Sequence, residues 1–199
     1  MAKVTRDLPV IAFASQQAWN TWLASQPAHS EGIWLKLAKK SVGLASVSKA
    51  EAVDVALCHG WIDGQLDSLD EKYWLVRFTP RQPNSKWSKK NRDRALQLVE
   101  LGRMRPAGAK EIERAQKDGR WAVAYASQSA AEIPNDLATA LARNKKAANF
   151  FETLDRANRY SILYRIHNAK KPETRVARIK AFVAMLAAGE TIHSRKSKR

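Results

Sequence analysis

All seven tryptophans of this 199-residue chain lie within its first 121 residues, whereas the last third is rich in Ala, Leu and Arg. Large aromatic side chains need a deep core, while short amphipathic helices can bury their apolar faces against one another. The distribution therefore predicts two modules of different construction. We place a Trp-rich α+β module at residues 1–129, a helical module docked on it at 130–190, and a basic tail at 191–199.

Most segments have helical spacing, and two do not. Ser48 followed by Glu51 is a capping-box pair, and Ser88 precedes another amphipathic segment, so each serine marks a helix start. Segments 34–37 and 73–79 are apolar or alternating and predict strands that pair with each other. The expected fold is mainly α-helical, with a small two-stranded β element in the N-terminal part and a C-terminal helical bundle.

The residue types that build metal and cofactor sites are sparse. A single cysteine excludes a disulfide framework and any multi-cysteine metal site, and the four histidines lack ligand spacing. Cys58 and His59 are adjacent on a predicted helix and do not face each other, so a buried thiol is favoured over a nucleophile. The acidic stretch 63–71 fits turns better than a cation loop. We expect no metal and no cofactor.

The start of the chain imitates a leader peptide only in part. Lys3 and Arg6 precede the apolar segment 8–14, but Asp7 and Pro9 interrupt the pattern. No apolar run approaches the length of a membrane-spanning helix, so no membrane span is expected. These features favour a cytoplasmic protein.

Positive charge is the main functional signal. The chain has 35 Lys and Arg against 19 Asp and Glu, a net charge of +16. Residues 77–105 hold nine basic side chains and two acidic ones. Such a field attracts phosphate-bearing partners, and the simplest of these is nucleic acid.

The first candidate site lies around the predicted helix start at Ser88. Exposed N–H groups and the positive end of the helix dipole favour an anion there, with Arg81 as a fork and Trp87 as a stacking face. The candidate ligand-binding residues of this segment are Arg77, Arg81, Ser85, Trp87, Ser88 and Asn91. Alternatively, Ser88 only caps its helix, Trp87 belongs to the core, and the lysines are solvated.

A second candidate site lies near the last helix. Thr174 is placed at its N-cap, Lys170 precedes it, and Arg175 and Arg178 share one helix face. An anion can bind there by the same physics. The alternative is that Glu173 pairs with these arginines on the surface.

Several long motifs place the chain near a known family. Over residues 13–189 it resembles the bacteriocin-protection, YdeI/OmpD-associated family. The motifs are Trp19-x-x-Trp22-Leu23, Ala56-Leu57-Cys58-x-Gly60-Trp61-Ile62-Asp63-Gly64, Arg77-Phe78-Thr79-Pro80-Arg81, Ser85-x-Trp87-Ser88, Asp118-Gly119-Arg120-Trp121 and Thr174-Arg175-x-x-Arg178-Ile179. The resemblance implies a link to envelope stress and to bacteriocin resistance, and it assigns no catalytic residue. A chain of charge +16 does not attract cationic peptides, which disfavours direct peptide capture.

Three functions are consistent with these patterns. The first is a non-catalytic protein that binds an anionic ligand, most simply nucleic acid. The second is a small-molecule enzyme or sensor, in which Asp63 is the base or orienting group and Arg81 the anion clamp. Its predicted cleft consists of Trp61, Asp63, Arg81, Ser85, Trp87 and Asn91. The third is an adaptor for an acidic protein. The pattern favours the first.

Overall fold

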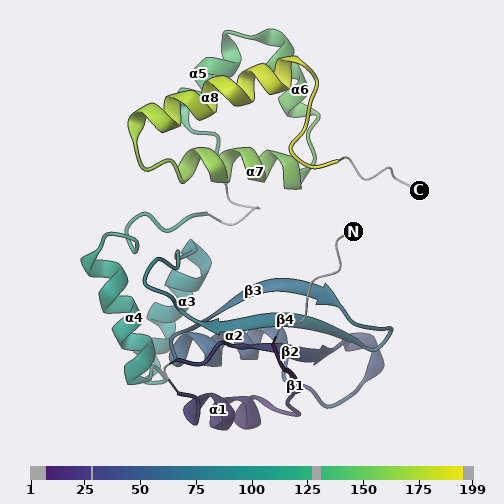
Figure 1. The fold of residues 1–199 in the computed structure, drawn as a ribbon, viewed down its shortest axis with the longest axis vertical. Helices are drawn as coiled ribbons and strands as arrows, with labels where there is room; N and C mark the ends of the chain where they lie inside the picture. Colours follow the sequence, from purple (N-terminus) through teal and green to yellow (C-terminus); the bar gives the residue numbers. More distant parts are fainter. Residues whose placement is uncertain (1–7, 28, 127–130, 195–199) are drawn as a thin grey trace. The chain divides into compact units, whose positions relative to one another are not determined.

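The computed structural model describes residues 8–27, 29–126 and 131–194 (Figure 1). The chain divides into two compact units, Met1–Ala124 and Tyr125–Arg199. Lys3 and Arg6 of the leader-like pattern lie outside the described residues, as do the predicted module boundary at 129/130 and the tail beyond residue 194.

The first unit is built on a four-stranded mixed sheet. Its strands are β1 (Val10–Ala12), β2 (Ile33–Ala38), β3 (Trp61–Ser68) and β4 (Tyr73–Pro80), in the order β1-β2-β4-β3. β1 pairs parallel with β2, and the other two pairings are antiparallel. The prediction of a mainly helical fold with two strands is therefore wrong, because the chain has an α+β fold with a larger N-terminal sheet.

The sequence did not predict β1 and β3, and each omission has a physical reason. β1 contains three residues, which is too short to display an alternating pattern. β3 contains polar residues and an irregular register between Asp63 and Leu66, which interrupts the alternation. The two predicted strands do exist and pair with each other, with Leu35 opposite Val76.

Serine caps begin three of the helices in this unit. Ser15 Oγ accepts a hydrogen bond from Ala18 N, and Ser88 Oγ accepts one from Asn91 N. Ser48 forms a complete capping box, as predicted. The helical segments are α1 (Gln16–Ala24), the 3-10 turn η1 (Lys40–Val42), α2 (Lys49–Cys58), α3 (Lys89–Glu100) and α4 (Pro106–Lys117).

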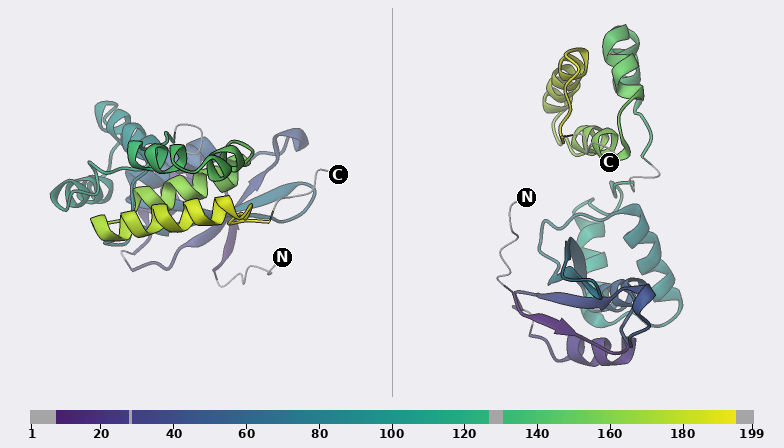
Figure 2. Two further views of the ribbon diagram at one scale, coloured as in Figure 1. Left: turned by 90° about the horizontal axis from the view of Figure 1, so that it is seen from above. Right: turned by 90° about the vertical axis from the view of Figure 1, so that its right-hand side faces the viewer.

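Helices α1 and α2 cover one face of the sheet (Figures 1 and 2). Trp19 lies at the centre of this core and stacks on Trp22, with ring centroids 5.4 Å apart. Its indole Nε1 donates to Ala52 O at 3.1 Å, which ties α1 to α2. A separate cluster around Trp87 and Leu98 packs α3 and α4 against the end of α2.

The second unit consists of short helices around its own core (Figure 1). They are α5 (Asn135–Ala142), α6 (Lys145–Glu152), α7 (Arg156–His167) and α8 (Pro172–Ala187). Leu137, Phe151 and Ile162 are buried in this core. The four helices stabilise one another by packing their apolar faces together, because most of the stability of a helix in a protein comes from such packing.

The predicted N-cap at Thr174 is wrong. α8 begins three residues earlier, with Lys171 as N-cap and Pro172 in the first turn. Proline fits the first helical position because its fixed φ suits a helix and its missing N–H would have had no partner there. Thr174 is therefore inside the helix, where it is exposed to solvent.

Candidate functional site

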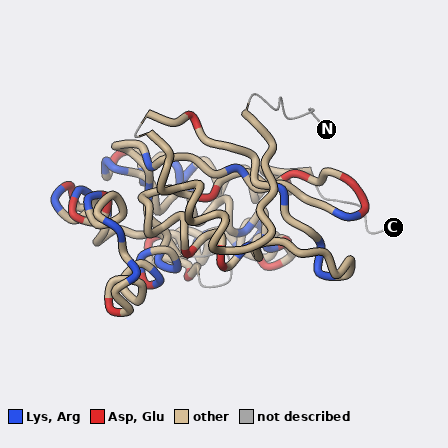
Figure 3. The backbone as a smooth tube through the Cα atoms, turned by 90° about the horizontal axis from the view of Figure 1, so that it is seen from below, with Lys and Arg blue, Asp and Glu red and all other residues tan. Residues whose placement is uncertain are grey.

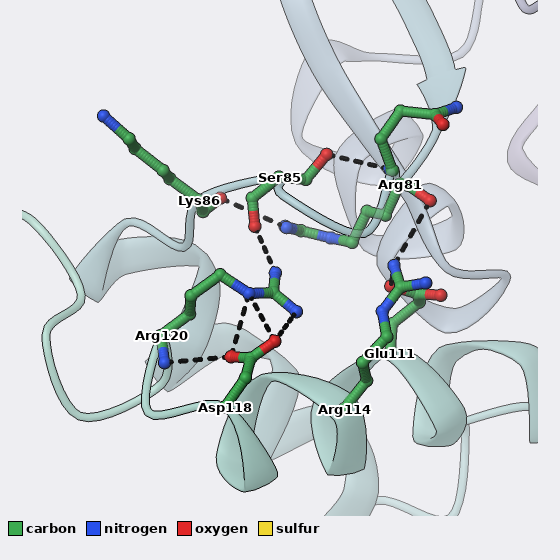
Figure 4. Close-up of polar contacts among 8 residues, drawn as sticks. Arg81, Ser85, Lys86, Glu111, Arg114, Asp118 and Arg120 are labelled. Carbon is green, nitrogen blue, oxygen red and sulfur yellow. Dashed lines mark hydrogen bonds and ion pairs between the residues drawn. The ribbon is translucent and has the colours of Figure 1, made fainter.

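Three arginines fasten the connection between β4 and α3, residues 81–88 (Figure 4). Arg81 Nη1 donates to Lys86 O at 3.2 Å, and Arg120 Nη1 donates to Ser85 O. Arg114 Nη2, from α4, lies 3.5 Å from the carbonyl oxygen of Arg81. These guanidinium groups bind backbone carbonyls, so they fix the path of the connection.

Two carboxylates compensate part of this charge. Glu111 pairs with Arg114 one helical turn away, and Asp118 Oδ2 lies 2.6 Å from Arg120 Nη2. The side-chain hydrogen bond from Arg120 is the main reason that the pKa of Asp118 lies below its ordinary value. The two arginines and the two carboxylates thus form an ion-pair network, which binds the connection through Arg114 and Arg120.

Arg81 and Trp87 contact each other in the interior. The guanidinium carbon of Arg81 lies 3.6 Å from the centroid of the Trp87 ring, and the ring of Trp121 packs edge-on at 4.8 Å. Arg81 is 5% exposed and Trp87 is 2% exposed. The predicted roles as surface clamp and stacking face are therefore not those seen in the structure, because the cation and the aromatic face satisfy each other.

The hydroxyl groups of this segment take part in local hydrogen bonds. Ser88 Oγ accepts from the backbone N–H of Asn91 at 3.1 Å, and Ser85 Oγ accepts from that of Gln82 at 2.9 Å. Ser88 and Asn91 thus form the helix start, and Ser85 closes a turn in the connection. These contacts agree with the alternative reading of the sequence, in which Ser88 caps its helix.

The predicted cleft residues are divided between two cores. Trp61 is buried in the core under α1 and α2, 6.4 Å from Trp19, whereas Trp87 belongs to the cluster under α3 and α4. Asp63 Oδ2 lies 3.6 Å from Lys49 Nζ at the start of α2. The structure places Asp63 beside Lys49 and Arg81 over the Trp87 ring, so the predicted cleft gains no support from this arrangement.

Arg77 lies on the sheet face opposite to α1 and α2. It is the register partner of Trp34 on β2, so both side chains point to the same side of the sheet. Within the described part of the chain, Arg77 Nε and Trp34 Nε1 are buried donors without a hydrogen-bond partner. Sequence reasoning predicted a basic surface here but not this cross-strand pair.

In the second candidate site, at the start of α8, both arginines form hydrogen bonds within the protein. Arg175 binds Asp136 through two hydrogen bonds of 2.6 and 3.0 Å and donates to Ile166 O. This arrangement lowers the pKa of Asp136. Arg178 donates to Arg165 O, and Lys170 lies exposed before the helix. Glu173 was the expected partner of Arg175, but the partner is Asp136, which lies close only in the folded unit.

A smaller group of cations remains exposed. Lys89, Lys90 and Arg105 form no ion pair with any carboxylate that the structure describes, whereas Arg94 binds Asp54 through two hydrogen bonds. Lys and Arg positions are interspersed with Asp and Glu positions along much of the chain (Figure 3). The uncompensated positive charge of residues 77–105 therefore includes Lys89, Lys90 and Arg105, which form no ion pair with a described carboxylate.

Sequence reasoning did not identify Arg114 and Arg120 as part of this site. Arg120 stands in the motif Asp118-Gly119-Arg120-Trp121, which carried the family resemblance, and that motif was the available signal. Arg114 had no signal, because its contact with the carbonyl of Arg81 spans 33 positions in the sequence.

Neither a metal cluster nor a membrane-spanning helix is present among residues 8–27, 29–126 and 131–194. Within these ranges, no three or more His, Cys, Asp or Glu side chains form a cluster suited to a metal ion. Within the same ranges, no helix combines the length and apolarity that crossing a bilayer requires.

The fold and the site define a basic two-unit protein, in which a Trp-rich α+β unit with an arginine-fastened connection precedes a helical unit. Residues 11–111 match the family described as a domain of unknown function (DUF8412), and the chain belongs to that family. Residues 130–189 match the family described as bacteriocin-protection, YdeI or OmpD-associated, which confirms the family resemblance for this part of the chain. Searches of curated proteins and of solved structures found no match.

Proposed function

We propose that this protein is a non-catalytic binder of anionic ligands, most simply nucleic acid, and that the exposed cations of residues 77–105 form its contact surface. The observation that carries the proposal is the exposure of Lys89, Lys90 and Arg105 without described carboxylate partners. A cation that already binds a carboxylate gains little from a phosphate, whereas a solvated one gains a new partner and releases counterions. The net charge of +16 adds long-range attraction.

The arginine network strengthens this proposal indirectly. Arg81, Arg114 and Arg120 hold the connection that leads into α3, so the first turn of α3 is presented at a fixed place. That turn carries Lys89 and Lys90 and contains no acidic residue. A rigid basic surface loses less conformational entropy on binding than a mobile one.

Fluorescence anisotropy with a short labelled DNA duplex and a single-stranded RNA tests the proposal. Contacts with phosphates predict that affinity falls steeply, on the order of a hundredfold or more for several contacts, between about 50 and 200 mM salt. Absence of binding, or binding that salt does not change, contradicts the proposal.

A pair of charge-matched variants locates the surface. Lys89→Glu with Lys90→Glu is expected to weaken binding about tenfold, because two phosphate contacts become repulsive. Lys145→Glu with Lys146→Glu is the control, since both lysines are also exposed in a helical first turn and the net charge changes equally. An equal loss in both double variants would show that only net charge matters.

A further inference from the structure

A cavity of about 250 Å³ lies at the end of β2, between residues 39–48 and the first turn of α2. Three lysines, Lys39, Lys40 and Lys49, line it together with the apolar side chains of Leu44 and Trp74. None of the described residues that line it is acidic. Its volume is slightly below the range of about 300–1,000 Å³ that holds drug-sized ligands, so an occupant must be small.

Hydrogen bonds hold the wall of this cavity in place. Ser46 Oγ accepts from Ala38 N and donates to Val47 O, each at 3.1 Å, and Val47 N donates to Phe13 O at 3.0 Å. Gly43 ends η1 with φ of 65°, a left-handed conformation that glycine adopts without steric cost. The wall is therefore formed before any ligand arrives, which reduces the entropy lost on binding.

The lysines outnumber the groups that neutralise them. Lys39 Nζ donates to the backbone carbonyl of Asp70 at 2.8 Å, and its charge also helps to lower the pKa of the Asp70 carboxyl. Lys49 Nζ lies 3.6 Å from Asp63 Oδ2. Lys40 is exposed and has no ion pair among the residues that the structure describes. Three lysines thus line a partly apolar cavity. Lys49 lies near the Asp63 carboxylate and Lys39 near that of Asp70, which leaves Lys40 as the lysine without an ion pair among the described residues.

We propose that this cavity binds a small organic anion whose carboxylate or phosphate lies among the three lysines and whose apolar body lies against Leu44 and Trp74. Ligand pockets combine an apolar lining with a few placed polar groups, and this cavity has that composition. The inference is independent of the nucleic-acid proposal, because it uses none of the residues between 77 and 105.

Nuclear magnetic resonance on the full chain tests the inference through the indole N–H signal of Trp74, which Trp74→Phe assigns by its disappearance. The probes are phenylacetate, phenyl phosphate, benzyl alcohol and inorganic phosphate. Saturable shifts of the Trp74 signal with either aromatic anion, together with much weaker binding of benzyl alcohol and inorganic phosphate, are the expected result. No saturable shift, or equal binding of benzyl alcohol or of inorganic phosphate, overturns the inference.

Two variants separate specific binding from general charge. Lys40→Ala is expected to weaken binding of the aromatic anions about three- to fivefold, as the loss of one partly exposed ion pair predicts. Lys110→Ala removes one exposed lysine elsewhere and is expected to leave binding unchanged. Leu44→Ala is expected to weaken the aromatic anions and to leave inorganic phosphate unaffected. Equal effects of Lys40→Ala and Lys110→Ala, or no effect of Leu44→Ala, overturn the inference.

Discussion

Arg81 illustrates how tertiary contacts reassign a residue that composition counts as a free cation. Its guanidinium lies over the Trp87 ring and donates to Lys86 O, at 5% exposure. A delocalised guanidinium is weakly hydrated and stacks on aromatic faces, so arginine tolerates such a place better than lysine. Local sequence placed Ser88 correctly at a helix start, since capping depends on neighbours three residues away. It did not reveal the burial of Arg81, which depends on contacts with Trp87 and Lys86 in the folded connection.

At Gly108 we expect substitution by alanine to destabilise the protein, although helix propensity alone predicts that alanine stabilises a helix. Gly108 lies inside α4, where alanine is normally more favourable by about 1 kcal/mol. A Cβ at this position would lie 2.5 Å from Cys58 O and 2.6 Å from Leu57 O, so α4 would have to move away from α2. We expect Gly108→Ala to lower the free energy of unfolding by about 1–3 kcal/mol in urea denaturation.

Ala109→Gly is the matched control for the Gly108 variant. It changes propensity at the neighbouring position of α4 and is expected to cost about 1 kcal/mol. A Gly108→Ala variant as stable as the natural chain, or more stable, would show that the close approach of α4 to α2 is not rigid.

His59 predicts a dependence of stability on pH. Burial, with a smaller contribution from Arg105, lowers its pKa below the ordinary value of 6.5. The unfolded chain therefore binds a proton at a pH where the folded chain does not, so stability is present above about pH 6.5 and decreases as the pH falls below it. Urea denaturation between about pH 5 and 7.5 measures this slope. His59→Gln keeps a polar contact for Asn20 and is expected to have a smaller slope; an identical slope would refute the assignment.

At the scale of elements, the serine-capped starts of α2 and α3 were predicted, whereas the edge strands β1 and β3 were not. Ser48 and Ser88 stand at the predicted positions because a cap is a local hydrogen bond. β3 is an edge strand whose side chains are mostly half-buried or exposed, so it lacks the apolar alternation of an inner strand. The start of α8 differs from the prediction because Pro172 favours a first-turn position more strongly than Thr174 favours a cap.

The connection between β4 and α3 is held in part by a distant side chain, that of Arg120. Arg120 donates to Ser85 O and its side chain is 17% exposed, so Arg120→Ala removes a charge-assisted hydrogen bond from a partly buried carbonyl. We expect a loss of about 1–2 kcal/mol and faster amide hydrogen exchange within residues 82–88. Arg143→Ala, at an exposed helix end, is the control and is expected to change neither. Unchanged exchange in the Arg120 variant would contradict the proposed fastening.

At the scale of the whole molecule, each unit has a core of its own. The first contains the Trp-rich clusters around Trp19 and Trp87, and the second contains the cluster around Phe151 and Ile162. Composition predicted this contrast because large aromatics and short Ala- and Leu-rich helices bury apolar surface in different ways. The residues that bind across long separations, such as Arg175 with Asp136, were not predictable, since no local pattern links them.

The second unit therefore carries a prediction about independent folding. Residues 125–199, prepared alone, are expected to show helical circular dichroism and cooperative thermal unfolding, because a domain with its own core folds alone. The first residues of this unit contact helix α7. The ring centroids of Tyr125 and Tyr164 lie 5.2 Å apart, and the Tyr160 hydroxyl donates to Ala126 O at 3.2 Å.

Tyr160 reports on these contacts, because burial raises its pKa to about 12. Removing residues 125–130 exposes the phenol, so in residues 131–199 we expect Tyr160 to titrate closer to pH 10, the ordinary value, and the melting temperature to fall. Ultraviolet titration of the tyrosines in both preparations measures the shift, and Tyr160→Phe identifies its contribution. A non-cooperative transition in residues 125–199 would show that the helical core needs the first unit. An unchanged Tyr160 titration in the shorter preparation would show that Tyr125 and Ala126 do not shield it.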